Sequence, residues 1–143
     1  MIRDLEATDF ARWRELFHAY GVFYKTDFSD ETLDKVWAIL QRDDVLHALV
    51  AEHDGVVQGI AHYRFHPDTF TAAHEWYLDD LFVAPESRGS GAATALIEAV
   101  AERAASDGGG KLRWITDVDN TTAQSVYDKV ATRTSWVTYE KQT

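Results

Sequence analysis

The segment from Leu81 to Ile97 constrains the fold most, because it has the pattern of a buried strand, a glycine loop and a helix in direct succession. The first backbone amides of a helix have no partner inside the helix, and the helix dipole makes that end positive. Gly89 and Gly91 leave the loop backbone open, and alanines at 92 and 93 keep the helix start open. Arg88 adds a planar cation that suits phosphate. The segment therefore predicts a site for a diphosphate group.

Two common diphosphate motifs do not match this segment. A dinucleotide fingerprint needs a third glycine where Thr94 stands, and the segment comes too late to follow the first strand of a Rossmann unit. A Walker loop needs Gly-Lys followed by Ser or Thr, whereas Gly110-Lys111 is followed by Leu112. A glycine-rich helix start without any ligand is the plain alternative to a diphosphate site.

Patterns along the rest of the chain predict one domain over residues 1–143 with a mixed α/β fold. Apolar spacing predicts four helices, over Asp9–Tyr20, Ser29–Leu40, Ser90–Ala105 and Thr121–Val130. Gly21 is expected to end the first helix, and Ser29 to cap the second. Strands are predicted over His47–Glu52, Val57–Phe65, Glu75–Val83, Leu112–Thr116 and Ser135–Tyr139. This order implies a mixed central sheet with helices on both faces, and the family resemblance described below implies that the sheet is mostly antiparallel.

Composition excludes several classes of function. The chain carries 14 Lys and Arg against 24 Asp and Glu, a net charge of −10, which is opposite to that of nucleic-acid-binding domains. No apolar run is long enough for a membrane span, and the first residues lack a signal core, so we expect a cytoplasmic protein. The absence of Cys excludes disulfides, thiolate metal sites and a Cys intermediate. The acidic charge could attract a cationic substrate or simply aid solubility.

Two segments resemble motifs of the GNAT N-acetyltransferase superfamily. Residues 88–93, Arg-Gly-Ser-Gly-Ala-Ala, resemble its coenzyme A pyrophosphate loop, and Asn120 to Lys129, with Tyr127, resembles its Asn…Ala…Tyr segment. The strand Tyr77-Leu-Asp-Asp-Leu-Phe-Val is similar to that of the polyamine and thialysine acetyltransferases and the histone/polyamine-type group. Two positions differ, since Asp79 stands where the polyamine enzymes have Glu, and Ala131 where Gly is usual.

The resemblance implies acetyl-coenzyme A as co-substrate, without a metal. The pyrophosphate would be held by the backbone amides of Arg88, Gly89, Ser90, Gly91, Ala92 and Ala93. The pantetheine would pair, as though it were another strand, with Leu81, Phe82 and Val83, whose strand splays from the next one. Asn120 would contact the cofactor arm, and Tyr127 would protonate the departing thiolate. The resemblance also favours a homodimer. The apolar C-terminal strand Ser135–Tyr139 could pair with a second subunit or form an edge within the single chain.

The chemistry of amine transfer assigns roles to two adjacent carboxylates. An alkylammonium, with a pKa of about 10.4, cannot attack until a neighbouring group takes its proton. Asp79 and Asp80 interrupt an apolar strand, where burying them unpaired would cost several kcal/mol, so they should face a wet cleft or pair with a cation such as Arg64. We expect Asp79 to act as base through water and Asp80 to hold the amine. A structural ion pair with Arg64 is the alternative.

Other candidate residues are less specific. Tyr24, together with Tyr20 and Phe23, could receive an ammonium by cation–π contact or could simply belong to the core of a helical turn. His62 and His66 flank Arg64 on one strand face, and the lack of further ligands argues against a metal there.

The leading hypothesis is an enzyme that moves acetyl in one step to a small cationic amine, with no covalent protein intermediate. Two alternatives are open. A catalytically silent acyl-coenzyme A sensor would keep the phosphate loop and lose the acid and base. A protein acetyltransferase would act on Lys or N-terminal amines and would need an open groove rather than a narrow cleft.

Overall fold

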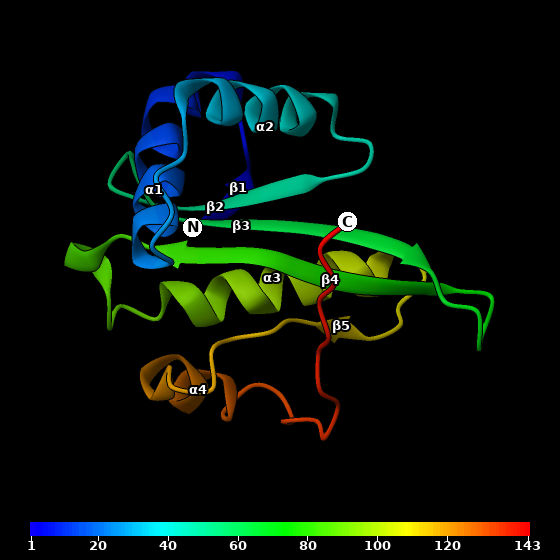
Figure 1. The fold of residues 1–143 in the computed structure, drawn as a ribbon. Helices are drawn as coiled ribbons and strands as arrows, with labels where there is room; N and C mark the ends of the chain where they lie inside the picture. The colour runs from blue at the N-terminus through cyan, green and yellow to red at the C-terminus, as the bar shows by residue number, and fades with distance from the viewer.

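A computed structural model describes residues 1–143, and its centre is one five-stranded sheet (Figure 1). The strands are β1 (Ile2–Asp4), β2 (His47–His53), β3 (Val56–Pro67), β4 (His74–Val83) and β5 (Leu112–Arg113). They lie in the order β1-β2-β3-β4-β5, and only β4 and β5 run parallel. The predicted mixed, mostly antiparallel sheet is confirmed.

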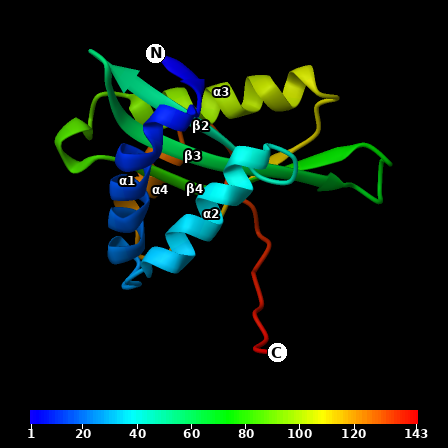
Figure 2. The ribbon, with the colours of Figure 1, turned by 90° about the horizontal axis from the view of Figure 1, so that it is seen from above.

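Helices cover both faces of this sheet (Figures 1 and 2). They are α1 (Phe10–Phe23), α2 (Asp30–Arg42), α3 (Ala92–Ser106) and α4 (Thr121–Tyr127), with 3₁₀ turns over Ala7–Asp9 and Pro85–Ser87. One buried apolar cluster lies between the sheet and the pair α1 and α2, and a second lies between the sheet and α3. None of the helices has both the length and the apolar character needed to cross a bilayer.

The second helix begins as predicted, whereas the first ends later. The Ser29 side chain accepts a hydrogen bond from the Thr32 amide and so caps α2. Gly21 lies inside α1 and is buried there. A Cβ on Gly21 would lie 2.7 Å from ring carbons of Phe28. Gly21 therefore allows the chain that follows α1 to pack closely against it, and it does not end the helix.

The short strand β1 is a feature that the sequence patterns missed. It pairs with residues 49 to 51 of β2. Arg3 donates two hydrogen bonds to the Asp9 carboxylate, at 2.8 and 3.0 Å, and one to Glu52 at 3.2 Å. These contacts join β1 to β2 and to the turn that precedes α1. They depend on tertiary structure, which the sequence of a three-residue polar strand does not indicate.

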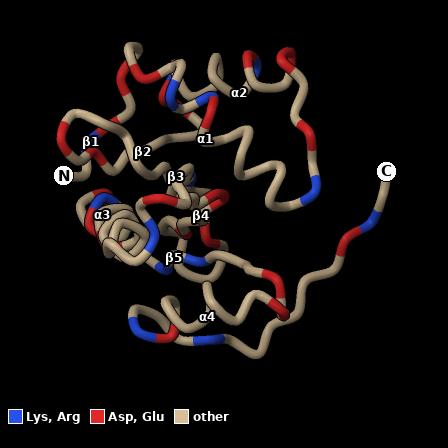
Figure 3. The backbone as a smooth tube through the Cα atoms, turned by 90° about the vertical axis from the view of Figure 1, so that its left-hand side faces the viewer, with Lys and Arg blue, Asp and Glu red and all other residues tan.

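The predicted C-terminal strand is wrong for the single chain. Residues 135–139 form no strand, and the chain from residue 132 to 143, which we call the C-terminal arm, extends away from the body (Figures 2 and 3). Trp136, Val137 and Tyr139 are 77%, 74% and 91% exposed. The apolar pattern that suggested a strand needs another strand to pair with, and the arm pairs with none. β5 is likewise shorter than predicted, ending at Arg113 rather than at Thr116.

Candidate active site

The sheet opens at one edge of β4. β5 pairs with β4 only at Trp76–Leu112 and Tyr77–Arg113, after which its chain turns toward α4 (Figure 1). Residues 81 to 83 of β4 pair with β3 on one side only. Their other side has no strand partner, so an extended ligand could add to the sheet there. This is the splayed arrangement that the sequence resemblance implied for Leu81, Phe82 and Val83.

The loop after β4 presents free backbone amides. Gly91 is the N-cap residue of α3 and has no side chain to satisfy the first amides. None of the amides from residue 91 to 94 donates to another protein group, and the first bond of the helix runs from the Ala95 amide to the Gly91 carbonyl. Gly89 and Gly91 have φ of 82° and 86°, and a Cβ on either would meet nothing within 4 Å. This open cradle of donors fits a diphosphate.

Arg88 and Ser90, in the loop, lie beside this cradle of amides. Arg88 stacks on Phe82, with its Cζ 5.5 Å from the ring centroid, and its Nε donates to the Val83 carbonyl at 3.4 Å. Ser90 is exposed, whereas Ala92 and Ala93 are half-buried. The contact with Phe82 holds the guanidinium between the open strand edge and the glycine loop.

A bulge in β4 decides where the two carboxylates point. The strand pairs around it are His62 with Asp80 and Tyr63 with Leu78, so Asp79 is the extra residue. Before the bulge, Leu78 faces the core beneath α3, and after it Phe82 faces the core beneath α1 and α2. In a regular strand both would face the same side. The bulge therefore turns Asp80 toward α1.

Asp79 is paired with Arg64. The Arg64 Nε donates to the two carboxylate oxygens of Asp79 at 2.9 and 3.2 Å, and the guanidinium lies 4.9 Å from the Tyr77 ring centroid. Burial raises the pKa of the Asp79 carboxyl, and Arg64 partly opposes this rise. The ion pair that the sequence offered as an alternative is present. The role of Asp79 as base stays a prediction.

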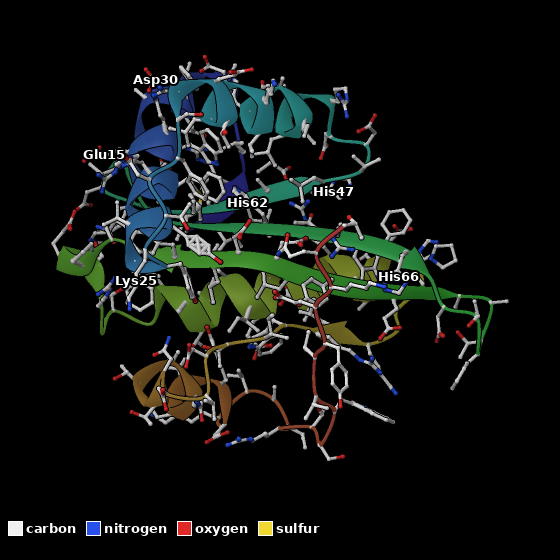
Figure 4. The ribbon with its side chains drawn as sticks, in the orientation of Figure 1. Glu15, Lys25, Asp30, His47, His62 and His66 are labelled. Atoms are coloured by element: carbon white, nitrogen blue, oxygen red, sulfur yellow. The ribbon has the colours of Figure 1, made fainter.

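Asp80 has a neutral partner instead of a cation. Its Oδ2 lies 2.9 Å from Nδ1 of His62, whose side chain is fully buried between β3 and α1 (Figure 4). The sequence patterns did not assign His62 any role in the site. No local signal could have done so, because its other contact comes from Trp13, 49 positions away.

Tyrosines from two helices surround Asp80. Burial raises the pKa of Tyr20, on α1, and of Tyr24, the residue that follows α1, and the nearby charge of Asp80 adds to both shifts. Their rings lie edge to face, with centroids 4.9 Å apart. Tyr24 is 47% exposed, so it forms a rim rather than part of the core. Tyr24 and Asp80 thus lie near each other, which is necessary if both bind the amine as predicted.

Tyr127 approaches the same place from α4. Burial raises the pKa of the Tyr127 phenol, and Tyr24 adds to the rise. Its ring packs edge-on against Trp114, with centroids 5.4 Å apart. The phenol therefore keeps its proton at neutral pH, as a proton donor must.

Asn120 serves the same helix as a cap. Its side-chain oxygen accepts a hydrogen bond from the Ala123 amide at 3.2 Å. Contact with the cofactor arm stays a prediction for Asn120. No three His, Asp or Glu side chains gather in a way that could hold a metal ion.

A split sheet whose open strand leads to a helix start with free amides is the arrangement that the sequence resemblance implies for an acyl-coenzyme A-dependent transferase. The chain belongs to the GNAT acetyltransferase family, because the profile described as Acetyltransferase (GNAT) family matches residues 11–131. It is an N-acetyltransferase that uses acetyl-coenzyme A.

Relatives and solved structures agree with this assignment. The D-amino-acid N-acetyltransferase HPA3 of Saccharomyces cerevisiae is 31% identical over 153 residues, covering 99% of this chain and 89% of the relative. A solved aminoglycoside acetyltransferase, AAC(6')-Iy, in complex with the bisubstrate analogue CoA-S-monomethyl-acetylneamine, superposes with a TM-score of 0.86 at 24% identity, covering 100% and 97% of the chains.

Other solved structures share the fold. A ribosomal-protein-alanine N-acetyltransferase from Brucella melitensis has a TM-score of 0.82 at 24% identity, with coverage of 100% and 99%. The likeness to the solved structures supports the fold alone. The finer resemblance to polyamine and thialysine enzymes is not confirmed, because the similar proteins include D-amino-acid and aminoglycoside acetyltransferases.

Proposed function

We propose that the protein acetylates a primary amine of a small cation, polyamine-like or lysine-type, by direct attack on acetyl-coenzyme A. The observation that carries the proposal is Asp80, a carboxylate without a cationic partner that lies beside Tyr20 and Tyr24. An ammonium placed there would meet one negative charge and two aromatic rings. Carboxylates and tyrosine faces are the groups that attract alkylammonium ions.

The cofactor site follows the open edge of β4. In this proposal the pyrophosphate lies on the free amides from residue 91 to 94, with Arg88 beside it, and the pantetheine extends along Leu81 to Val83. Acetyl-coenzyme A supplies a thioester that an uncharged amine can attack. The reacting carbonyl would then lie between the carboxylates of β4 and the phenol of Tyr127.

Two proton transfers complete the reaction. The bound ammonium must lose a proton, and we propose that Asp80 accepts it, because Arg64 already neutralises Asp79. Asp79, acting through water, is the competing acceptor. Tyr127 donates a proton to the thiolate, since its raised pKa keeps the phenol protonated. A silent acyl-coenzyme A sensor would lack the proton acceptor and the proton donor, whereas this chain has candidates for both.

A D-amino-acid acceptor is a second candidate, favoured by the 31% identity to a D-amino-acid N-acetyltransferase. Its carboxylate would need a cation close to the amine site. Arg64 is 42% exposed but is already engaged by Asp79, which favours acceptors without a carboxylate. A protein Lys or N-terminal amine would need an open groove across the same site.

A thiol-release assay across an amine panel tests the proposal. The panel contains spermidine, a Lys peptide, an aminoglycoside, a D-amino acid and an uncharged arylamine. Spermidine should have the highest kcat/KM, and added salt should reduce its advantage because the net charge of −10 is screened. Equal kcat/KM for anionic and cationic acceptors would contradict the cationic substrate. No thiol release with any amine would favour the sensor.

We also propose a cytoplasmic homodimer. The absence of Cys suits a reducing compartment. The C-terminal arm exposes the apolar side chains of Trp136, Val137 and Tyr139. These side chains would be covered if the arm of one copy packed against a second copy. The arm lines a groove of about 890 Å³ together with β5 and α4 of its own chain.

A further inference from the structure

His62 lies at the centre of the molecule, and the reaction described above does not use it. Its side chain is fully buried, and its ring packs edge-on against Phe17 with centroids 4.9 Å apart. A polar ring in an apolar core needs hydrogen-bond partners. His62 has two, one on each ring nitrogen.

Trp13 decides which nitrogen of His62 carries the proton. The Trp13 Nε1 lies 2.9 Å from the His62 Nε2, and both side chains are fully buried. An indole N–H can only donate, so Nε2 must accept. The neutral ring then carries its proton on Nδ1, which lies 2.9 Å from Oδ2 of Asp80. His62 therefore donates to the carboxylate.

This chain of hydrogen bonds engages only one oxygen of Asp80, Oδ2. Oδ2 accepts from His62, no Lys or Arg side chain pairs with the carboxylate, and the Tyr20 hydroxyl lies close enough to interact with it. The Asp80 side chain is 24% exposed and lies directly across the strand pair from His62. The neighbouring Asp79, by contrast, has both oxygens engaged by Arg64. Asp80, unlike Asp79, is held in place without a guanidinium on its oxygens and is partly exposed, so a bound ammonium can reach it.

We propose that His62, itself fixed by Trp13, is a positioning residue that orients the Asp80 carboxylate toward the substrate's ammonium. This inference rests on the proposed function, in which Asp80 receives the amine. His62 touches neither substrate nor cofactor and acts through Asp80. The Trp13 indole excludes the other neutral tautomer of His62, in which Nδ1 would present a lone pair to Asp80 instead of donating a proton.

Two amide variants separate the two hydrogen bonds of His62. In His62→Asn the amide nitrogen takes the place of Nδ1, and in His62→Gln the amide oxygen takes the place of Nε2. His62→Gln should raise the KM for spermidine about 10- to 100-fold, the effect of losing one hydrogen bond to a charged group. His62→Asn should restore this KM to within about threefold of wild type. The KM for acetyl-coenzyme A should not change in either variant.

A core variant controls for packing. Leu33→Val removes one methylene from the same buried cluster without touching Asp80, and its KM for spermidine should equal that of wild type. An uncharged arylamine such as 4-anisidine should lose no affinity in His62→Gln. Equal rises of the spermidine KM in the Asn and Gln variants, or no rise in either, would overturn the positioning role.

Nitrogen NMR of the unliganded protein tests the same role without turnover. Wild type should show His62 protonated on Nδ1 alone, and Trp13→Phe should lose this fixed tautomer. A wild-type ring protonated on Nε2 would refute the arrangement. Spermidine titrated in the same spectra should bind wild type more tightly than His62→Gln, even if no acetyl transfer occurs. Equal binding would overturn the positioning role, whereas tighter wild-type binding without turnover would overturn only the proposed reaction.

Discussion

The two adjacent carboxylates of β4 differ in their partners, and this difference decides which of them can serve a bound ammonium. Asp79 faces the guanidinium of Arg64 at 2.9 Å. A second cation placed near Asp79 would also be repelled by Arg64, and this repulsion offsets part of the attraction to the carboxylate. Asp80 faces an imidazole instead, and no Lys or Arg side chain pairs with it.

The pH dependence of two variants distinguishes these carboxylates. Asp80→Asn should lower kcat for spermidine about 10²–10⁴-fold at pH 7, the usual range for a lost proton acceptor. The loss should shrink by about tenfold per pH unit, because the free amine fraction grows as pH rises toward its pKa. Asp79→Asn should cost less than about tenfold. The measurement is kcat against pH, and a larger loss in Asp79→Asn would instead support the water-linked base.

Tyr127→Phe tests the proposed proton donor. It should lower kcat by about 10²–10⁴-fold with little change in the KM for acetyl-coenzyme A, and high pH should not rescue it. In wild type the donor is lost only as pH rises through its pKa. Because burial raises that pKa above 10.0, the alkaline fall in kcat should lie above pH 10. Tyr139→Phe, on a ring that is 91% exposed, is the matched control and should keep full kcat. An unimpaired Tyr127→Phe would make Tyr127 a packing residue.

Individual site residues were predictable where a motif surrounds them. Tyr127 follows Asn120 by seven positions, and the glycine loop follows its strand directly, so local sequence contains both signals. The pairing of His62 with Trp13 and the turn of Asp80 at the bulge depend on contacts between distant segments. A regular two-residue alternation cannot anticipate a bulge, because one added residue reverses every side chain after it.

At the scale of elements, the proposed phosphate site lies at the junction of β4, the glycine loop and α3. A branched side chain at Gly91 is a poor probe of this site. The residue has φ of 86°, and a non-glycine residue there costs roughly 1–2 kcal/mol of backbone strain. Ser90 is exposed, has no positive φ, and precedes the same free amides.

Ser90→Asp should separate folding from cofactor binding. A carboxylate near the start of α3 stabilises the helix by about 0.3–1 kcal/mol, yet it repels a diphosphate. At a hundredfold excess over its dissociation constant, acetyl-coenzyme A should stabilise wild type by about 2.7 kcal/mol. Thermal unfolding should therefore show an unchanged or higher Tm for free Ser90→Asp and a much smaller rise on adding acetyl-coenzyme A. The neutral Ser90→Asn should respond like wild type, and an undiminished rise in Ser90→Asp would place the pyrophosphate elsewhere.

Elements were predictable where their signals are local. Ser29 with the acidic residues after it marks the start of α2, and the alanine-rich run marks α3. β1 was not predictable, because three residues are too few to show the alternation of apolar and polar residues typical of a strand. Its position also depends on contacts from Arg3 to Asp9 and Glu52. Glycine often ends a helix, but at position 21 the absence of a side chain instead allows the close approach of Phe28.

At the scale of the whole molecule, the unpaired surface lies at one end of the sheet. Acidic residues are spread around the backbone rather than gathered at one face (Figure 3). The C-terminal arm is exposed, and β5 has a strand partner on only one side. Exposed strand edges and apolar arms are usually covered by another chain. The arm adds no strand to the sheet of its own chain, which is why we propose that it pairs with a second copy.

The homodimer prediction follows from this arm. If the arm of one copy covers the open side of β5 in a second copy, the full chain should sediment as a dimer at micromolar concentration. Val137→Lys should give a monomer, because a charge in the middle of the apolar stretch would be buried without a partner. Gln142→Lys adds the same charge beyond that stretch and should remain a dimer. Both variants should keep the circular dichroism of wild type, since the arm makes no strand with its own chain. A full chain that sediments as a monomer, or a Val137→Lys variant that stays dimeric, would show that the arm does not join two copies.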